Sequence, residues 1–253
     1  MKTKIVLEKV NTDIMSTASR TLCAGEIQGA RIYHHILTAG ESLQLCDSLS
    51  YYRIVMLIAG TAEFVTAGES YVFSERVTII PALDKTLDMI AREKVDILEI
   101  QWDTLPEDAA LSQSYSVRFP YVQQYRLCIQ YSEETKSEKT ISRMTIPQRV
   151  IPRLACGSVE TYGEDIVQPH KHPMLDQLFF SFPENNMEVL IDGEHVPMAG
   201  NEIIHIPLGS AHGVYVPEGA HCHYLWFDFI LDNEEGLEEL DSSQQVTGDI
   251  RSF

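Results

Sequence analysis

Short runs of β-branched and aromatic residues recur along this chain, and this recurrence constrains its fold more than any other feature. Gly, Pro, Asn and Asp separate the runs, which is typical of strands that end in turns. Helical periodicity is scarce. Regular short strands with such punctuation predict an all-β sandwich or barrel. The clearest runs cover residues 52–58, 62–65, 77–80, 95–100, 178–182, 187–191, 203–206 and 224–229.

The order of these features in the first half of the chain returns in the second half. Turn residues and strand ends follow one another in the same sequence in both halves. This similarity indicates a weak internal duplication, with about one repeat per 120 residues. The matching segments are Gly60, 67–69 and 79–81 in the first half, and 192–194, Gly200 and 205–207 in the second.

The predicted domain organisation follows from this duplication. Residues 132–139, rich in Ser, Glu and Lys, are interpreted as an exposed loop between the halves. The C-terminal residues carry an excess of acidic side chains against Arg251 alone, which predicts a solvated or disordered tail. The predicted parts are an N-terminal domain at 1–110, a linker at 111–145, a C-terminal domain at 146–232 and an acidic tail at 233–253.

Composition limits the classes of partner. The chain has 253 residues and a formal net charge of −18, so it repels phosphate backbones and anionic lipids. We therefore expect neither nucleic-acid nor membrane binding. A glutamate, Glu8, interrupts the N-terminus before a signal-like apolar core forms, so export is not expected and a cytoplasmic location is. Five cysteines without CxxC spacing favour reduced thiols.

Histidines are concentrated in the second half, where seven of the nine fall between His170 and His223. His170 and His172 are separated by one residue, so on a strand both imidazoles share a face. His212 follows a Pro-X-Gly turn on a later run and can meet them across a small barrel. Three neutral imidazoles plus one oxygen donor suit a divalent transition metal such as Mn, Fe, Ni or Zn. We expect one such ion per chain.

These residues resemble the two motifs of the cupin family, and the resemblance covers nearly the whole chain. It implies an all-β fold of two tandem double-stranded β-helix (cupin, jelly-roll) barrels. It also implies a metal in the second barrel and a degenerate first barrel, in which residues 51–53 stand where His-X-His would be. The first motif is matched by Gly163, His170, His172, Gln177 and Gly193, and the second by Gly200, Pro207, Gly209 and His212.

The fourth metal ligand has two candidates, Asp176 and Gln177. Many cupins use glutamate there. The four residues that separate His172 from Gln177 favour the glutamine, which would bind through its amide oxygen as a neutral ligand. The metal would then keep a fuller positive charge than with glutamate. Asp176 remains the alternative.

The layout is similar to that of the bicupin 5-deoxyglucuronate and 5-keto-4-deoxyuronate isomerases. This similarity implies a metal-dependent enzyme with isomerase or lyase-like chemistry on a small sugar-derived hydroxy or keto acid, the metal stabilising an enediolate. Arg153 would hold a substrate carboxylate in a bidentate pair. The candidates for proton transfer are His223, Tyr215, Glu188 and Tyr224.

Two other functions are compatible with the same residues. A mononuclear iron or nickel dioxygenase would consume oxygen. A non-enzymatic binding or regulatory cupin would hold a small molecule without turnover. His221 and His223 form a second His-X-His that shares a strand face with Leu225 and Phe227, with no distant partner evident in the sequence. A homodimer is expected, because the sheet edges and faces of such barrels need cover.

Overall fold

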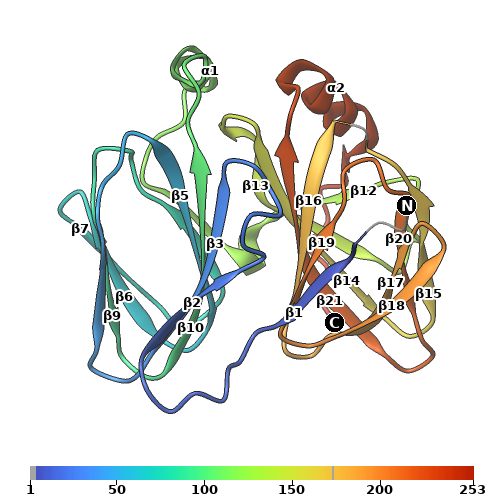
Figure 1. The fold of residues 1–253 in the computed structure, drawn as a ribbon, viewed down its shortest axis with the longest axis horizontal. Helices are drawn as coiled ribbons and strands as arrows, with labels where there is room; N and C mark the ends of the chain where they lie inside the picture. The colour runs from blue at the N-terminus through green and yellow to red at the C-terminus, as the bar shows by residue number, and fades with distance from the viewer. Residues whose placement is uncertain (1–3, 173) are drawn as a thin grey trace. The chain divides into compact units, whose positions relative to one another are not determined.

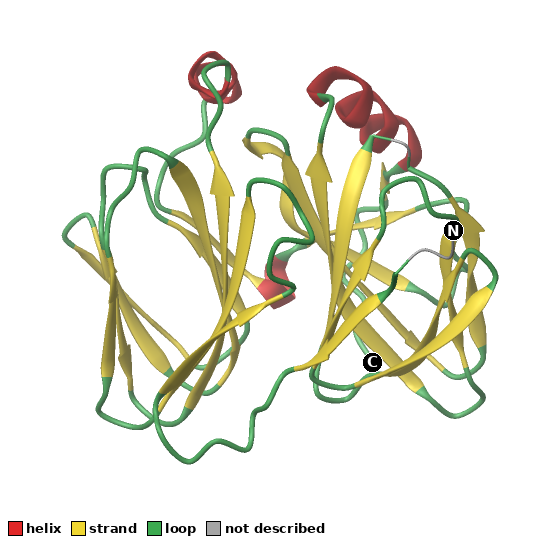
Figure 2. Cartoon of the chain, in the orientation of Figure 1, coloured by secondary structure: helices red, strands yellow, loops and turns green. Residues whose placement is uncertain are grey.

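Antiparallel strands dominate the computed structural model, which describes residues 4–172 and 174–253 (Figures 1 and 2). The chain divides into two compact units. The first barrel is Val10–Leu127, and the second barrel is Cys128–Phe253 together with Met1–Lys9. Among the described residues, no helix is long and apolar enough to cross a membrane.

The first barrel has a six-stranded sheet in the order β11-β8-β5-β10-β3-β2 and a four-stranded sheet in the order β4-β9-β6-β7. Helix α1 and one short 3-10 turn, Tyr125–Leu127, complete it. The bounds are β2 Ala18–Leu22, β3 Ala30–Leu37, β4 Ser42–Leu45, β5 Tyr51–Ala59, β6 Ala62–Thr66, β7 Glu69–Phe73, β8 Val77–Ile80, β9 Leu87–Ala91, β10 Val95–Asp103, α1 Asp108–Tyr115 and β11 Tyr121–Gln124.

The second barrel has an eight-stranded sheet in the order β1-β19-β16-β21-β14-β13-β12-β22 and a four-stranded sheet in the order β15-β20-β17-β18. Strand β1 comes from the N-terminus and pairs with β19. The bounds are β1 Val6–Lys9, β12 Ile129–Ser132, β13 Ile141–Ile151, β14 Leu154–Tyr162, β15 Asp165–His170, β16 Leu175–Ser181, β17 Asn186–Ile191, β18 Glu194–Ala199, β19 Glu202–Ile206, β20 His212–Val216, β21 His221–Ile230, α2 Asn233–Ser243 and β22 Gln245–Val246.

The two barrels repeat one strand order. The series β8-β5-β10-β3-β2 of the first barrel corresponds to β19-β16-β21-β14-β13 of the second, and β4-β9-β6-β7 corresponds to β15-β20-β17-β18. Matching hairpins also share their turn. Ala67-Gly68 and Asp192-Gly193 both have positive φ at the two central residues, which is the turn that suits the twist of a hairpin. The predicted internal duplication is therefore confirmed.

Alternating side chains build each core. In β6, for example, Ala62, Phe64 and Thr66 are buried while the residues between them are not. Each fully buried Val, Leu, Ile or Phe contributes about 1.5–3 kcal/mol. The first core includes Val55, Leu57, Phe64, Ile79 and Ile97, and the second includes Phe179, Val189, Ile204, Val214 and Trp226.

The structure differs from the expected linker and acidic tail. Residues 111–145 contain β11, β12 and the start of β13. The tail forms α2 and β22, because its acidic groups have partners. The Asp232 side chain accepts hydrogen bonds from the backbone N–H groups of Glu234 and Glu235 at the start of α2, and Asp241 pairs with Arg149. An acidic composition alone therefore did not indicate disorder.

Candidate metal centre

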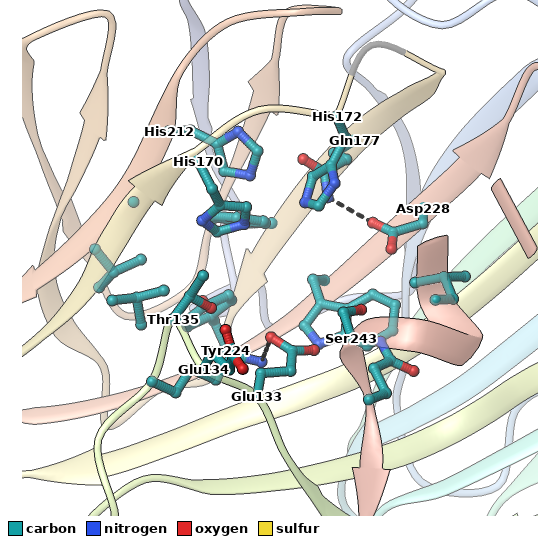
Figure 3. Close-up of a pocket in the computed structure, with 18 of the residues that line it drawn as sticks. Glu133, Glu134, Thr135, His170, His172, Gln177, His212, Tyr224, Asp228 and Ser243 are labelled. Atoms are coloured by element: carbon teal, nitrogen blue, oxygen red, sulfur yellow. Dashed lines mark hydrogen bonds and ion pairs between the residues drawn. The ribbon is translucent and has the colours of Figure 1, made fainter. Parts of the chain in front are cut away.

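Three histidines converge at one end of the second barrel. His170 ends β15 and lies opposite His212, the first residue of β20, while His172 follows β15 in the chain. The ring centroids are 4.7 Å apart for His170 and His212 and 4.8 Å apart for His170 and His172. One nitrogen of each ring lies within 4.8 Å of the others. The predicted trio thus forms a cluster that can hold a metal ion (Figure 3).

Each of the three imidazoles is oriented through its Nδ1 atom. The Nδ1 of His170 donates to the carbonyl of Gln168 at 2.8 Å, and that of His212 donates to the carbonyl of Ser210 at 3.2 Å. The Nδ1 of His172 bonds to the carboxylate of Glu239 in α2. A carbonyl only accepts, so the proton resides on Nδ1 and the lone pair on Nε2. Such partners orient metal-binding histidines and raise their basicity.

Gln177, and not Asp176, lines the same cavity. Neighbouring residues of β16 point to opposite faces, and the Asp176 carboxylate accepts from His205 Nε2 at 2.7 Å on the other side. The Gln177 amide nitrogen donates to the buried carboxylate of Asp228 at 2.6 Å (Figure 3). This bond leaves the amide oxygen of Gln177 as the atom that suits a cation.

A cavity of about 300 Å³ adjoins the histidine cluster. Strands of both sheets form its wall, the loop between β12 and β13 closes one side, and the end of α2 closes another. The described lining residues include Glu133, Glu134, Thr135, Lys136, Val167, His170, His172, Gln177, Phe179, His212, Gly213, Val214, Tyr224, Trp226, Asp228, Leu240, Ser242, Ser243, Gln244 and Gln245.

Burial disfavours the charged forms of His170, His212 and Asp228 in the metal-free protein. Burial, together with the adjacent His170 and His172, lowers the pKa of His212 to about 3. It also lowers the pKa of His170. Burial raises the pKa of Asp228 to about 6. Metals bind the deprotonated imidazole, so depressed histidine pKa values remove proton competition for the ion.

The loop between β12 and β13 supplies cavity residues that the sequence did not indicate. Lys136 and Glu133, expected in an exposed loop, form an ion pair of 2.8 Å with side chains only 8% and 14% exposed. The Thr135 carbonyl accepts from the backbone N–H of Gln168, which attaches the loop to β15. The Lys136 ammonium also lies 4.9 Å from the ring centre of Tyr131. No local spacing marked these residues, because their position depends on tertiary packing.

Of the four residues expected to move protons, only Tyr224 lines the cavity. Its ring packs 4.7 Å from that of Phe179, and burial raises its pKa well above the ordinary value. His223 lies on the opposite face of β21, because Tyr224 and Trp226 face the cavity.

Tyr215 and Glu188 form a cross-strand pair on the outside of the small sheet, since their neighbour Val214 faces the cavity. There Glu188 accepts from the Nδ1 of His195 at 2.7 Å. Arg153, expected to hold a carboxylate, is buried in the turn between β13 and β14 and does not line the cavity.

Solved structures with the same architecture include a cupin barrel protein. A cupin 2 conserved barrel domain protein from Leptotrichia buccalis aligns with a TM-score of 0.59 at 15% identity over 87% of this chain and 92% of its own. An IolB-like protein from Salmonella typhimurium aligns with a TM-score of 0.68 at 14% identity over 90% and 93%. The oxalate decarboxylase of Lactobacillus farciminis, in a formate complex, aligns with a TM-score of 0.66 at 11% identity over 98% and 90%.

These comparisons establish the fold. No family model matches the sequence, and the search of curated proteins found no similar one. The neighbours span both barrels at low identity, so they show architecture. The expected all-β chain of two tandem cupin barrels is confirmed.

Proposed function

We propose that the second barrel is a metal-dependent enzyme that moves a proton within a small sugar-derived hydroxy or keto acid, as an isomerase or lyase. One observation carries this proposal. His170, His172 and His212 meet at a cavity with their Nδ1 atoms engaged and their Nε2 atoms left for a ligand. Gln177 would be the fourth ligand, through its amide oxygen.

The donor set fits a divalent transition metal. Three neutral imidazoles and one amide oxygen add no charge, so the ion would keep its full +2 charge. An ion bound there would supply Lewis-acid polarisation of substrate oxygens. Asp228 positions the site, because its carboxylate accepts from the Gln177 amide nitrogen and so directs the amide oxygen.

The remaining cavity groups suit an acid substrate and proton transfer. Lys136 is the cationic side chain among the described lining residues, and it can bind a carboxylate or keto oxygen. Glu133, 2.8 Å from that ammonium, can accept a proton from a carbon next to the bound oxygen and return it to a neighbouring carbon. The loop from Glu133 to Lys136 and the end of α2 cover part of this cavity.

The structural neighbours support the substrate class. One of them is named an oxalate decarboxylase and holds formate, so a barrel of this architecture acts on a small carboxylic acid. In our chain the volume of about 300 Å³ has room for a larger acid of several carbons. We therefore place hydroxy and keto acids derived from sugars first.

The test begins with metal analysis of the protein purified without an affinity tag. The His170→Ala/His172→Ala variant is expected to hold one metal ion per chain fewer than the parent. The control is His195→Ala, which removes an exposed imidazole that also bonds to a carboxylate and should leave the metal content unchanged. Equal metal content in the double variant and the parent, after reconstitution of both, would overturn the proposal.

Chemistry is then tested by solvent exchange. Uronic, hydroxy and keto acids are incubated with the metal-loaded protein in D2O, and deuterium incorporation at carbon is followed by NMR. We expect incorporation that the His170→Ala/His172→Ala and Glu133→Gln variants lose. Oxygen uptake without exchange would instead identify a dioxygenase. Tight binding of an acid with neither reaction would identify a binding protein.

A further inference from the structure

The second His-X-His pair, His221 and His223, lies on the face of β21 that points away from the cavity. The antiparallel register places Glu160 of β14 directly opposite His223. The ring centroids of His221 and His223 are 5.6 Å apart, with 26° between the ring planes. A ligand atom of each of the three residues lies within 4.8 Å of the others. The fold thus provides the partner that the sequence did not reveal.

Glu160 is held in a fixed orientation. The Nη1 atom of Arg143 donates to its Oε2 atom at 2.7 Å, while its Oε1 atom lies 3.2 Å from His221 Nε2 and 3.7 Å from His223 Nδ1. One carboxylate oxygen of Glu160 therefore faces both imidazoles, and the guanidinium of Arg143 binds the other oxygen and orients the side chain.

A fourth candidate ligand, a carboxylate oxygen, comes from the turn between β16 and β17. The Oε1 atom of Glu184 lies 2.6 Å from His223 Nδ1, and the adjacent Asn185 side chain accepts from the backbone N–H of His223 at 2.8 Å. The side chains of Glu184 and His221 are 32% and 25% exposed, so an ion can enter from solvent. His223 itself is 3% exposed and gives the cluster a buried base.

We propose that Glu160, His221 and His223, with Glu184 as the fourth ligand, bind a second divalent metal ion of the zinc type. The separations between donor atoms support this. Four ligands at about 2.0–2.1 Å from a tetrahedral zinc ion lie about 3.4 Å from one another, close to the 3.2 and 3.7 Å that separate Glu160 Oε1 from the two imidazoles. The Glu184 oxygen, now 2.6 Å from His223 Nδ1, would move away from that nitrogen as the ion enters between them. Histidine and carboxylate oxygen are also the ligand types that zinc takes.

Charge supports the same assignment. With neutral imidazoles, the carboxylates of Glu160 and Glu184 outnumber the guanidinium of Arg143 by one negative charge. A divalent cation offsets that excess without protonating a histidine. A site with four protein ligands keeps no open position, so its role is structural. It joins β14, β21 and the turn that contains Glu184.

The test counts zinc ions bound to the full chain. Metal-free protein is titrated with ZnCl2, and bound zinc is measured after gel filtration. The parent is expected to bind two ions per chain, and the His221→Ala/His223→Ala and His170→Ala/His172→Ala variants one each. His195→Ala should bind two. If only the cavity site fails, the parent and the His170→Ala/His172→Ala variant bind one ion each and the His221→Ala/His223→Ala variant binds none, so the two proposals are tested separately.

Two further measurements distinguish loss of the second site from misfolding of the double variant. Glu184→Gln changes a partly exposed residue and is expected to weaken the second ion by about ten-fold, the scale of effect known for groups around a metal. Cobalt(II) bound to the His170→Ala/His172→Ala chain should absorb visible light, and adding His223→Ala should remove that absorption. The chain must lack a C-terminal tag, because the Phe253 ring lies 6.5 Å from that of His221.

The proposal is overturned by any of three results. The His170→Ala/His172→Ala chain, shown to be folded by circular dichroism, binds no zinc ion. The His221→Ala/His223→Ala chain, shown to be folded by circular dichroism, binds as many ions as the parent. Glu184→Gln leaves the affinity of both ions unchanged.

Discussion

The two barrels share one strand order but differ in what fills their interiors. The second barrel has a cavity of about 300 Å³ beside its three histidines. The pocket at the corresponding end of β5 in the first barrel, beside Tyr51 and Arg53, measures about 10 Å³. One topology therefore supports both a hollow and a filled barrel, and side chains at a few positions decide between them.

Matched positions show how the filled barrel does without histidines. His170 and His212 pair across the last residue of β15 and the first of β20. Leu45 and Leu87 pair across the last residue of β4 and the first of β9, and both are buried.

The expectation that residues 51–53 stand in place of His-X-His is wrong, because they begin β5, the counterpart of β16. The short strand β4 is mostly exposed and lacks a strong sequence pattern.

A buried ion pair further distinguishes the first barrel. Arg53 pairs with Glu99, whose carboxylate also accepts from His35 at 2.8 Å and from Gln101 at 2.9 Å. These polar groups satisfy one another within the protein. In the second barrel, the histidine Nε2 atoms and the Gln177 amide oxygen are left for a ligand. The comparison teaches that the polar groups of the first barrel bond to one another, whereas those of the second barrel leave donor atoms free to bind a ligand.

The largest effect on stability is expected from a substitution that breaks the buried ion pair of the first barrel. Glu99→Gln leaves the guanidinium of Arg53 buried without its charged partner, which typically costs about 3–5 kcal/mol. Each barrel has one tryptophan, Trp102 in the first and Trp226 in the second. Urea unfolding followed by fluorescence in a Trp226→Phe background therefore reports the first barrel alone.

The matched control for Glu99→Gln is Asp103→Asn on the same strand. Asp103 pairs with Arg31 at 2.7 Å, but both side chains are well exposed, so a much smaller change is expected. Equal effects of the two substitutions would show that burial does not set the strength of the network.

The second prediction concerns Asp228, which has no charged partner like Arg53. Burial raises its pKa from an ordinary 3.8 to about 6. Between these pH values the folded metal-free chain holds a proton that the unfolded chain has lost, so stability falls as pH rises through the window and stays lower above it. Asp228→Asn removes this loss, which amounts to about 3 kcal/mol above pH 7.

The measurement for Asp228→Asn is urea unfolding followed by Trp226 fluorescence from pH 4 to pH 8, in the presence of a chelator. The gain over the parent should grow as pH rises from about 4 to about 6 and then level off. A gain that is constant across this range would contradict the raised pKa. The comparison with Glu99→Gln is then direct, because one carboxylate stabilises its barrel and the other destabilises it.

The sequence predicted the parts of the site that depend on local geometry. The alternation of strand side chains predicted that His170 and His172 would meet, and their rings are 4.8 Å apart although His172 lies just past the end of β15. The same rule places His221 and His223 together with Leu225 and Phe227 on β21. The fold class also follows from such local patterns. Which face of β21 lines the cavity is a property of the closed barrel, so the sequence analysis named both His223 and Tyr224, and only Tyr224 lines the cavity.

The residues that close the cavity could not be predicted from the sequence, because their positions also depend on the closed barrel. Glu133 and Lys136 stand in a polar segment with no periodic pattern, and Glu239 belongs to a tail whose composition suggested disorder. Their positions follow from contacts with distant segments, such as the bond from Gln168 to the Thr135 carbonyl. An excess of like charge along a sequence does not show which of those charges meet a histidine or an arginine in the fold.

The smallest effect is predicted for a substitution in α2, which tests whether this helix strengthens metal binding in the second barrel. Glu239 bonds to the Nδ1 of His172, and the neighbouring Leu240 is buried at the cavity. Glu239→Gln keeps the shape but removes the charge that raises the basicity of that imidazole, so affinity for the cavity ion should fall about ten-fold. Chelator competition with zinc measures it, in the His221→Ala/His223→Ala background to isolate one ion. Glu238→Gln, exposed on the same helix, should leave the affinity unchanged. Equal affinities for the two variants would mean that α2 covers the site without tuning it.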